Sequence, residues 1–180
     1  MSGSVGNWRV ELVEVHRDLF APPCDAAFAA RGAPECGPGW HDLLDRLCVR
    51  IRKATHAGGD FRFSQIKEKY GTLRVYWDGR LSPEATIQVE EAIALAEARS
   101  ATCCEVCGEP GRLHGGAWLT TRCTVHAEGR APVESRPGLE NIYIVSYVAG
   151  DDRSQITCRR YDRDTDTFTE VDPASLPVEE

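Results

Sequence analysis

The chain has 180 residues, of which 42% are hydrophobic, so it can form one ordinary domain, with or without a small appendage, and the composition argues against wholesale disorder. It does not begin with a basic start followed by an apolar run, and no stretch approaches about eighteen apolar residues, so we expect a cytoplasmic protein with no membrane contact. The formal net charge of −7 argues against simple affinity for nucleic acid, which basic residues drive.

The N-terminal third predicts a weak strand, a loop and a helix, in that order. Residues 8–15 place alternate apolar side chains on one face, which is a weak strand signal. Residues 21–39 are rich in proline and glycine and are expected to form a loop. Apolar residues then recur at helical spacing over 40–51, and the glycine pair at 58–59 is expected to end this helix.

The middle of the chain predicts a strand pair and a second helix. Apolar and polar residues alternate around Phe61 and again over 73–77, which indicates a hairpin, with a longer loop at the KEKYG sequence of 67–71. Ser82 and the following proline and glutamate are typical of a helix start. We expect the second helix to pack its apolar stripe, within 85–96, against the first helix and the strands.

The C-terminal part predicts a linker over 127–140, and then three strands at 141–148, 154–161 and 167–171 that form a small β-meander. Residues 173–180 are expected to be a flexible tail. The fold class is therefore predicted to be α+β. It has a core domain over 1–126, with two helices, a small antiparallel sheet and a finger at about 103–126, followed by the meander within 141–172.

The finger is predicted from two pairs of metal-ligand residues. The sequence CEVC places Cys104 and Cys107 two residues apart, and CTVH gives Cys123 and His126 the same spacing. Such pairs are typical of zinc sites with four cysteine or histidine ligands. The glycine-containing segment between them predicts a hairpin. A final pair that opens a helical turn resembles a treble-clef finger, and a zinc ribbon is the alternative. Four protein ligands leave no open position, so we expect one structural zinc ion.

Several cysteine and histidine residues lie outside this ligand set. Cys103 is a possible substitute for its neighbour, although the two-residue spacing favours Cys104. His114 lies in the predicted hairpin and is expected to be exposed. The remaining cysteines are scattered through the sequence and are expected to be buried free thiols: Cys24, Cys36, Cys48 and Cys158.

Catalytic signatures are weak. The sequence contains no P-loop, dinucleotide glycine fingerprint, HExxH or GxSxG motif. A nucleophile or second metal site within 36–45 is less consistent with the pattern than a solvated helix flank. A treble-clef nuclease would need a water-activating histidine in the hairpin, and His114 has no partner at suitable spacing. An enzyme is therefore the third choice.

A basic segment rich in aromatic residues occupies the centre of the chain. Residues 50–80 carry 8 basic and 3 acidic side chains, and the segments on either side are acidic. The simplest interpretation is a strand pair with an apolar inner face and a basic outer face. This outer face would suit an acidic protein partner, or single-stranded nucleic acid by stacking and charge. The candidate partner-binding residues are Arg62, Lys67, Lys69 and Arg74.

Three motifs resemble a family of small uncharacterised proteins of phages and bacterial genomes. They are CGPGWHDLLDRLC, QIKEKYGTLRVYWDG and CEVCGEPGRLHGGAWLTTRCTVHA, which together span about 36–127. The resemblance implies a helix, a strand and a C-terminal treble-clef-like finger, and it implies no activity. We expect a non-enzymatic zinc-binding protein that acts through protein–protein interaction, such as a phage accessory factor or a toxin-neutralising immunity protein. A nucleic-acid-binding regulator that uses 50–80 is the alternative.

Overall fold

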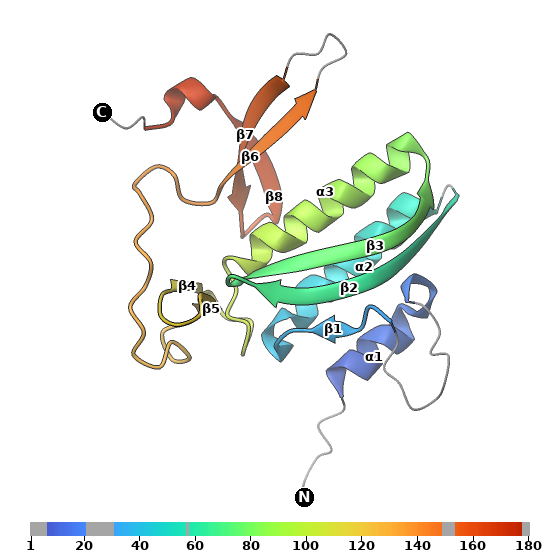
Figure 1. Cartoon of the computed structure of the whole chain (residues 1–180), viewed down its shortest axis with the longest axis horizontal. Helices are drawn as coiled ribbons and strands as arrows, with labels where there is room; N and C mark the ends of the chain where they lie inside the picture. Colours follow the sequence, from blue (N-terminus) through green and yellow to red (C-terminus); the bar gives the residue numbers. More distant parts are fainter. Residues whose placement is uncertain (1–6, 21–30, 57, 149–153, 178–180) are drawn as a thin grey trace, which may run out of the picture. The chain divides into compact units, whose positions relative to one another are not determined.

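A computed structural model describes residues 7–20, 31–56, 58–148 and 154–177 of the chain (Figure 1). It divides into two compact units, Met1–Pro132 and Val133–Glu180. The described part of the first unit contains three α-helices, a three-stranded sheet and a two-stranded sheet, and that of the second contains a three-stranded sheet. The expected α+β class is confirmed. No helix in the described ranges is both long and apolar enough to cross a membrane.

The segment predicted as a weak strand is the first helix, α1 (Trp8–Val15), so that prediction is wrong. Asn7 caps this helix, because its side-chain oxygen accepts a hydrogen bond of 3.2 Å from the N–H of Arg9. Leu12 and His16 lie one turn apart and are both buried. Apolar alternation over so few residues fits a helix as well as a strand, and packing against the neighbouring elements selects the helix.

The two stronger helix predictions are confirmed as α2 (His41–Thr55) and α3 (Pro83–Ser100). Ser82 caps α3 as expected, with its hydroxyl oxygen 3.2 Å from the N–H of Ala85. The two helices pack against each other on one side of the hairpin (Figure 1). Trp40, Leu44 and Leu47 belong to the apolar stripe predicted over 40–51, and they are fully buried in the same cluster as Leu73, Val89 and Ala92.

The three-stranded sheet has the order β1-β2-β3, formed by Pro34–Glu35, Gly59–Lys69 and Thr72–Leu81. β1 pairs with β2 in parallel, so the sheet is mixed and not purely antiparallel as expected. The predicted longer loop is also wrong, because β2 continues through Lys69. The turn consists of Tyr70 and Gly71, with φ of 55° and 80°. Two successive positive φ values are typical of the tight type I′ hairpin turn.

The two faces of this hairpin differ in chemistry. Phe61, Phe63, Ile66 and Leu73 are buried on the inner face, beneath the helices. The basic residues share the outer face, because neighbouring side chains of a strand point in opposite directions and a β-bulge between Phe63 and Gln65 shifts the alternation by one residue. The strands are thus half-buried, as the sequence pattern predicted.

The predicted finger hairpin is confirmed as the antiparallel pair β4 (Arg112–His114) and β5 (Thr120–Arg122). The final ligand pair opens a turn, in which the N–H of His126 donates to the carbonyl of Cys123, and residues 124–129 form successive turns rather than a longer helix. The beginning of the predicted linker packs on the finger. The N–H of Gly115 donates to the carbonyl of Ala131 over 3.0 Å, and Pro132 forms a β-bridge with His114.

The second unit contains the predicted meander, β6 (Ile142–Val148), β7 (Ser154–Asp162) and β8 (Thr167–Val171), with antiparallel pairing throughout. Tyr161 is buried and its hydroxyl donates a 2.6 Å hydrogen bond to Asp166. The predicted tail begins with a single 3₁₀ turn, Pro173–Ser175, while 178–180 lie outside the described residues.

Candidate metal centre

The four predicted metal ligands converge on one point of the finger. The ligand atoms of Cys104, Cys107, Cys123 and His126 all lie within 4.8 Å of one another, an arrangement that can hold a metal ion. The sulfur atoms of Cys107 and Cys123 are 3.7 Å apart. The Nδ1 atom of His126 lies 3.6 Å from the sulfur of Cys104 and 3.2 Å from that of Cys123. Such spacings are those expected between ligands that share one small ion.

Each ligand pair is held by a turn of the backbone. In the first pair, the N–H of Gly108 donates to the carbonyl of Cys104 over 2.8 Å. Gly108 has a φ of +79°, which a residue without a side chain adopts most easily. In the second pair, the N–H of His126 donates to the carbonyl of Cys123 over 3.1 Å. The local sequence thus brings both ligands of each pair to the same side of a turn.

The surroundings shift the pKa values of Cys104 and Cys107 in opposite directions. Burial raises the pKa of Cys104, but hydrogen bonds from the backbone N–H groups of Cys123, Cys107 and Val106 outweigh it and lower that pKa to about 6. Desolvation and the neighbouring thiols raise the pKa of Cys107 to about 11. Cys104 is therefore a thiolate at neutral pH, the form in which cysteine binds metals. A bound cation would displace the proton that Cys107 retains.

The finger is hydrogen-bonded to the segment that leads into α2. The N–H of Gly39 donates to the carbonyl of Glu105 over 2.8 Å, and the N–H of Gly37 donates to its carboxylate over 2.9 Å. The indole N–H of Trp40 donates to the carbonyl of Cys103 over 3.1 Å. Three N–H donors within residues 37–40 therefore bind the finger at the two residues that flank its first ligand, Cys104.

Two further contacts complete this attachment. The second carboxylate oxygen of Glu105 forms a 2.7 Å ion pair with Arg122, the residue that precedes the ligand Cys123. The hydroxyl of Thr121 donates to the carbonyl of Gly71, at the hairpin turn, over 2.6 Å. The sequence pattern did not predict this attachment. The glycines on both sides of Pro38 were its only signal, and they fall in the segment that was expected to be a loop.

Cys103 is not part of the candidate centre. It is buried in the hydrophobic core, and its carbonyl accepts the Trp40 bond, whereas the metal-capable group contains Cys104. The expectation that His114 is exposed is wrong. Its side chain is 3% exposed, and its Nδ1 atom lies 2.9 Å from the carbonyl of Arg112. His114 therefore contributes to the packing of the finger.

The other cysteines in the described ranges are free and buried, as expected, and Cys24 lies outside them. Burial raises the pKa of Cys36 to about 12 and raises that of Cys48 further. Thiols of this acidity remain protonated at neutral pH. The nearby His41 and Asp42 are both exposed, and Asp45 contacts the buried His16 over 2.8 Å.

The four candidate partner-binding residues lie on the outer face of the hairpin. Lys67 and Arg74 are directly opposite each other in the β2–β3 register. Arg62 lies 3.3 Å from Asp60, and Arg74 lies 3.9 Å from Glu97. Lys67 and Lys69 make no ion pair within the described chain; their ammonium groups lie 5.5 Å and 5.2 Å from the ring centres of Tyr76 and Tyr70.

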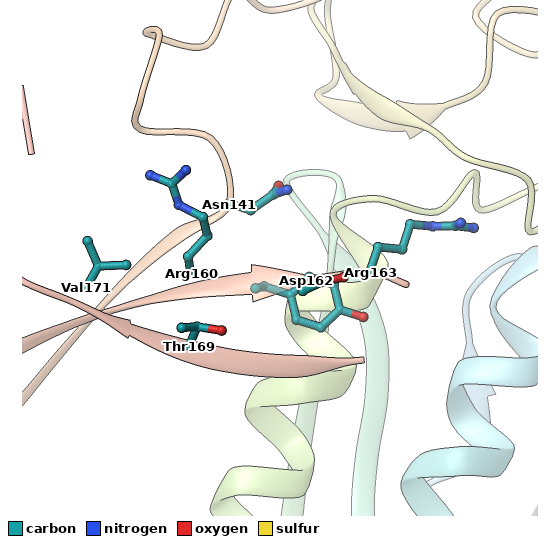
Figure 2. Close-up of a pocket in the computed structure, with 7 residues that line it drawn as sticks. Asn141, Arg160, Asp162, Arg163, Thr169 and Val171 are labelled. Carbon is teal, nitrogen blue, oxygen red and sulfur yellow. The ribbon is translucent and has the colours of Figure 1, made fainter. Parts of the chain in front are cut away.

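A shallow depression of about 440 Å³ lies in the second unit (Figure 2). Two of its charged groups already have partners within the unit. Arg160 donates to the carbonyl of Gly138 over 2.8 Å, and Asp162 accepts the N–H of Asp164 over 2.8 Å. We therefore assign no ligand to it. The lining residues are Asn141, Arg160, Tyr161, Asp162, Arg163, Thr169 and Val171.

No protein-family model, curated protein sequence or solved structure matches the chain. The candidate centre therefore rests on the chemistry of its own residues, and these can hold a metal ion.

Proposed function

We propose that the metal is zinc and that it stabilises a protein which acts by binding another protein. A tetrahedral zinc ion with bonds of about 2.3 Å to sulfur and about 2.0 Å to nitrogen requires about 3.8 Å between two sulfurs and about 3.5 Å between sulfur and nitrogen. The distances of 3.7 Å between Cys107 and Cys123 and 3.6 Å between Cys104 and His126 agree with these values, whereas the 3.2 Å between Cys123 and His126 is shorter. Three thiol ligands and one imidazole also favour zinc over magnesium or calcium.

The observation that carries the proposal is the closed ligand set, attached to the core. Four protein ligands fill a tetrahedron, so no position remains for water or substrate. The hydrogen bonds of Glu105 join the ligand turn to Gly37 and Gly39. Zinc bound here would therefore stabilise the first unit, and it would supply no catalytic water. With Cys36 buried and His114 packed within the finger, binding is better supported than chemistry.

The resemblance to small phage and bacterial proteins supports two roles within this class: a phage accessory factor, or an immunity protein that neutralises a toxin. Both need a stable folded surface and no active site. The net charge of −7 supports a protein partner over a nucleic acid.

Metal analysis and partner capture test the two parts separately. We expect one zinc ion per purified chain, measured by inductively coupled plasma mass spectrometry, and loss of that zinc in Cys107→Ser. Protein prepared without chelators and lacking stoichiometric zinc would reject the metal assignment. Affinity purification from the native host, with Cys107→Ser as the comparison, should recover a stoichiometric protein that needs the intact site. A co-purifying toxin would identify the immunity role.

A nucleic-acid regulator is the second candidate, because Tyr70 and Tyr76 lie beside lysines on the exposed hairpin face. Retention on immobilised single-stranded DNA that falls steeply with salt would favour this role over protein binding.

A further inference from the structure

We propose that the partner presents an extended acidic segment, and that it binds along the outer face of the β2–β3 hairpin. This inference rests on the proposed protein-binding function and gives the partner its chemistry. The binding surface, which we call the basic strip, consists of Lys67, Lys69, Arg74 and Tyr76 on the strands and Tyr70 in the turn.

The two lysines of the basic strip are left without an acidic partner in the described chain, and Arg74 has one distant partner. Lys67 and Arg74 face each other directly across the two strands, a like-charged pair that is unfavourable on an exposed sheet face. In the described chain, Arg74 has an acidic group only at 3.9 Å, Glu97, and the two lysines have no ion pair. Glu35 is the register neighbour of Lys67 on β1, yet these two described residues form no ion pair. An acidic partner would relieve the repulsion.

The spacing of the cations fits an extended chain. Lys67 and Lys69 lie two residues apart on one strand, which places their side chains about 6.8 Å apart on the same face. Alternate side chains of an extended peptide have the same repeat. Carboxylates at alternate positions of a partner segment can therefore meet both lysines in register. Tyr76 is 47% exposed and Tyr70 is 61% exposed, so their rings offer flat apolar contact between the charges.

The charge of the rest of the chain favours a peptide over a nucleic acid. Residues 133–180 contain 5 basic and 11 acidic side chains and are covalently tethered to the first unit. The whole chain has a formal net charge of −7, which disfavours binding of a polyanion more than binding of a peptide with a few carboxylates.

Fluorescence anisotropy with defined probes tests the proposal on the full zinc-loaded chain. The probes are a labelled peptide of about twelve residues that alternates Glu and Thr, its Lys–Thr counterpart, and an oligothymidylate of about the same length, each at about 20 mM and 200 mM salt. We expect saturable binding of the Glu–Thr peptide at low salt, with little binding of the Lys–Thr peptide. Lys67→Glu with Lys69→Glu should weaken the binding about tenfold or more.

The matched control reverses two exposed cations elsewhere, Arg17 and Lys53, which changes the net charge by the same amount. It should lower the affinity for the Glu–Thr peptide less than threefold. A loss equal to that of the Lys67 and Lys69 reversal would show that only net charge matters. No saturable binding of that peptide at low salt would overturn the proposal, as would tighter binding of the oligothymidylate. Far-ultraviolet circular dichroism and zinc content must match between the variants. If partner capture from the host survives the reversal at Lys67 and Lys69, the protein-binding function stands and the basic strip is rejected.

Discussion

Replacing Gly39 with alanine should reduce both the stability of the first unit and its affinity for zinc. A Cβ atom at this position would lie 2.3 Å from the carbonyl oxygen of Cys104, 2.5 Å from the amide nitrogen of Gly108 and 2.6 Å from that of Cys107. All three neighbours are backbone atoms of the ligand turn, so no flexible side chain can give way. The finger must then separate from the segment before α2.

The magnitude follows from the contacts that separation would break. Forcing an extra carbon into a close-packed site costs about 1–3 kcal/mol. Loss of the 2.8 Å hydrogen bond from Gly39 to Glu105 adds about 1 kcal/mol. We expect the free energy of unfolding to fall by about 2–4 kcal/mol. Because two ligands belong to the displaced turn, zinc affinity should fall about tenfold or more, since each tenfold change corresponds to about 1.4 kcal/mol.

Urea denaturation with excess zinc measures the first quantity, and competition with a chromogenic chelator measures the second. Gly129→Ala is the control, because a Cβ added there would meet nothing within 4 Å and only the φ of +75° is unfavourable. It should cost about 1 kcal/mol and leave zinc affinity unchanged. The attachment of the finger to the core is refuted if Gly39→Ala binds zinc within twofold of the unsubstituted chain and its free energy of unfolding falls by less than that of the control.

Two other substitutions test the core and an ion pair of the first unit. Leu44 is fully buried, so Leu44→Ala should cost about 2–5 kcal/mol in thermal or urea unfolding, and a loss under about 0.5 kcal/mol would place this helix face at the surface. The hydrogen bond from Arg52 lowers the pKa of Asp18 below its usual 3.8, so this carboxylate stabilises the fold above that pH and loses its contribution as the pH falls through the lower value. Because Asp18 is largely exposed, Asp18→Asn should cost at most about 1 kcal/mol at pH 7, and the difference from the unsubstituted chain should shrink as the pH falls below 3.8.

The features that could be predicted are those that depend on residues close together in the sequence. Helix α2 follows from apolar spacing over 40–51, and Ser82 marks the start of α3 through its capping hydroxyl. The metal ligands follow from two pairs at fixed spacing, because a two-residue gap brings both side chains to one ion.

The errors have two physical causes. Helix α1 was missed because the apolar pattern over 8–15 fits both the helical and the strand repeat. The tight hairpin turn was missed because Tyr70 adopts a positive φ, which its residue type does not suggest. The attachment of the finger was missed for a different reason. Backbone groups of Gly37 and Gly39 make most of its bonds, to Glu105 more than sixty residues away, and backbone groups carry no residue-specific signal.

The long sequence separation between Trp40 and Cys103, 63 residues, has a consequence for the rate of unfolding. Contacts between distant segments close a large loop, and they tend to form late, after local helices and hairpins. The final ligand, His126, follows every core element of the first unit along the chain. Interactions that form after the folding transition state affect mainly the unfolding rate. Zinc bound at this site should therefore slow the unfolding of the first unit and leave its refolding rate nearly unchanged, so the ion would act mainly on kinetic stability.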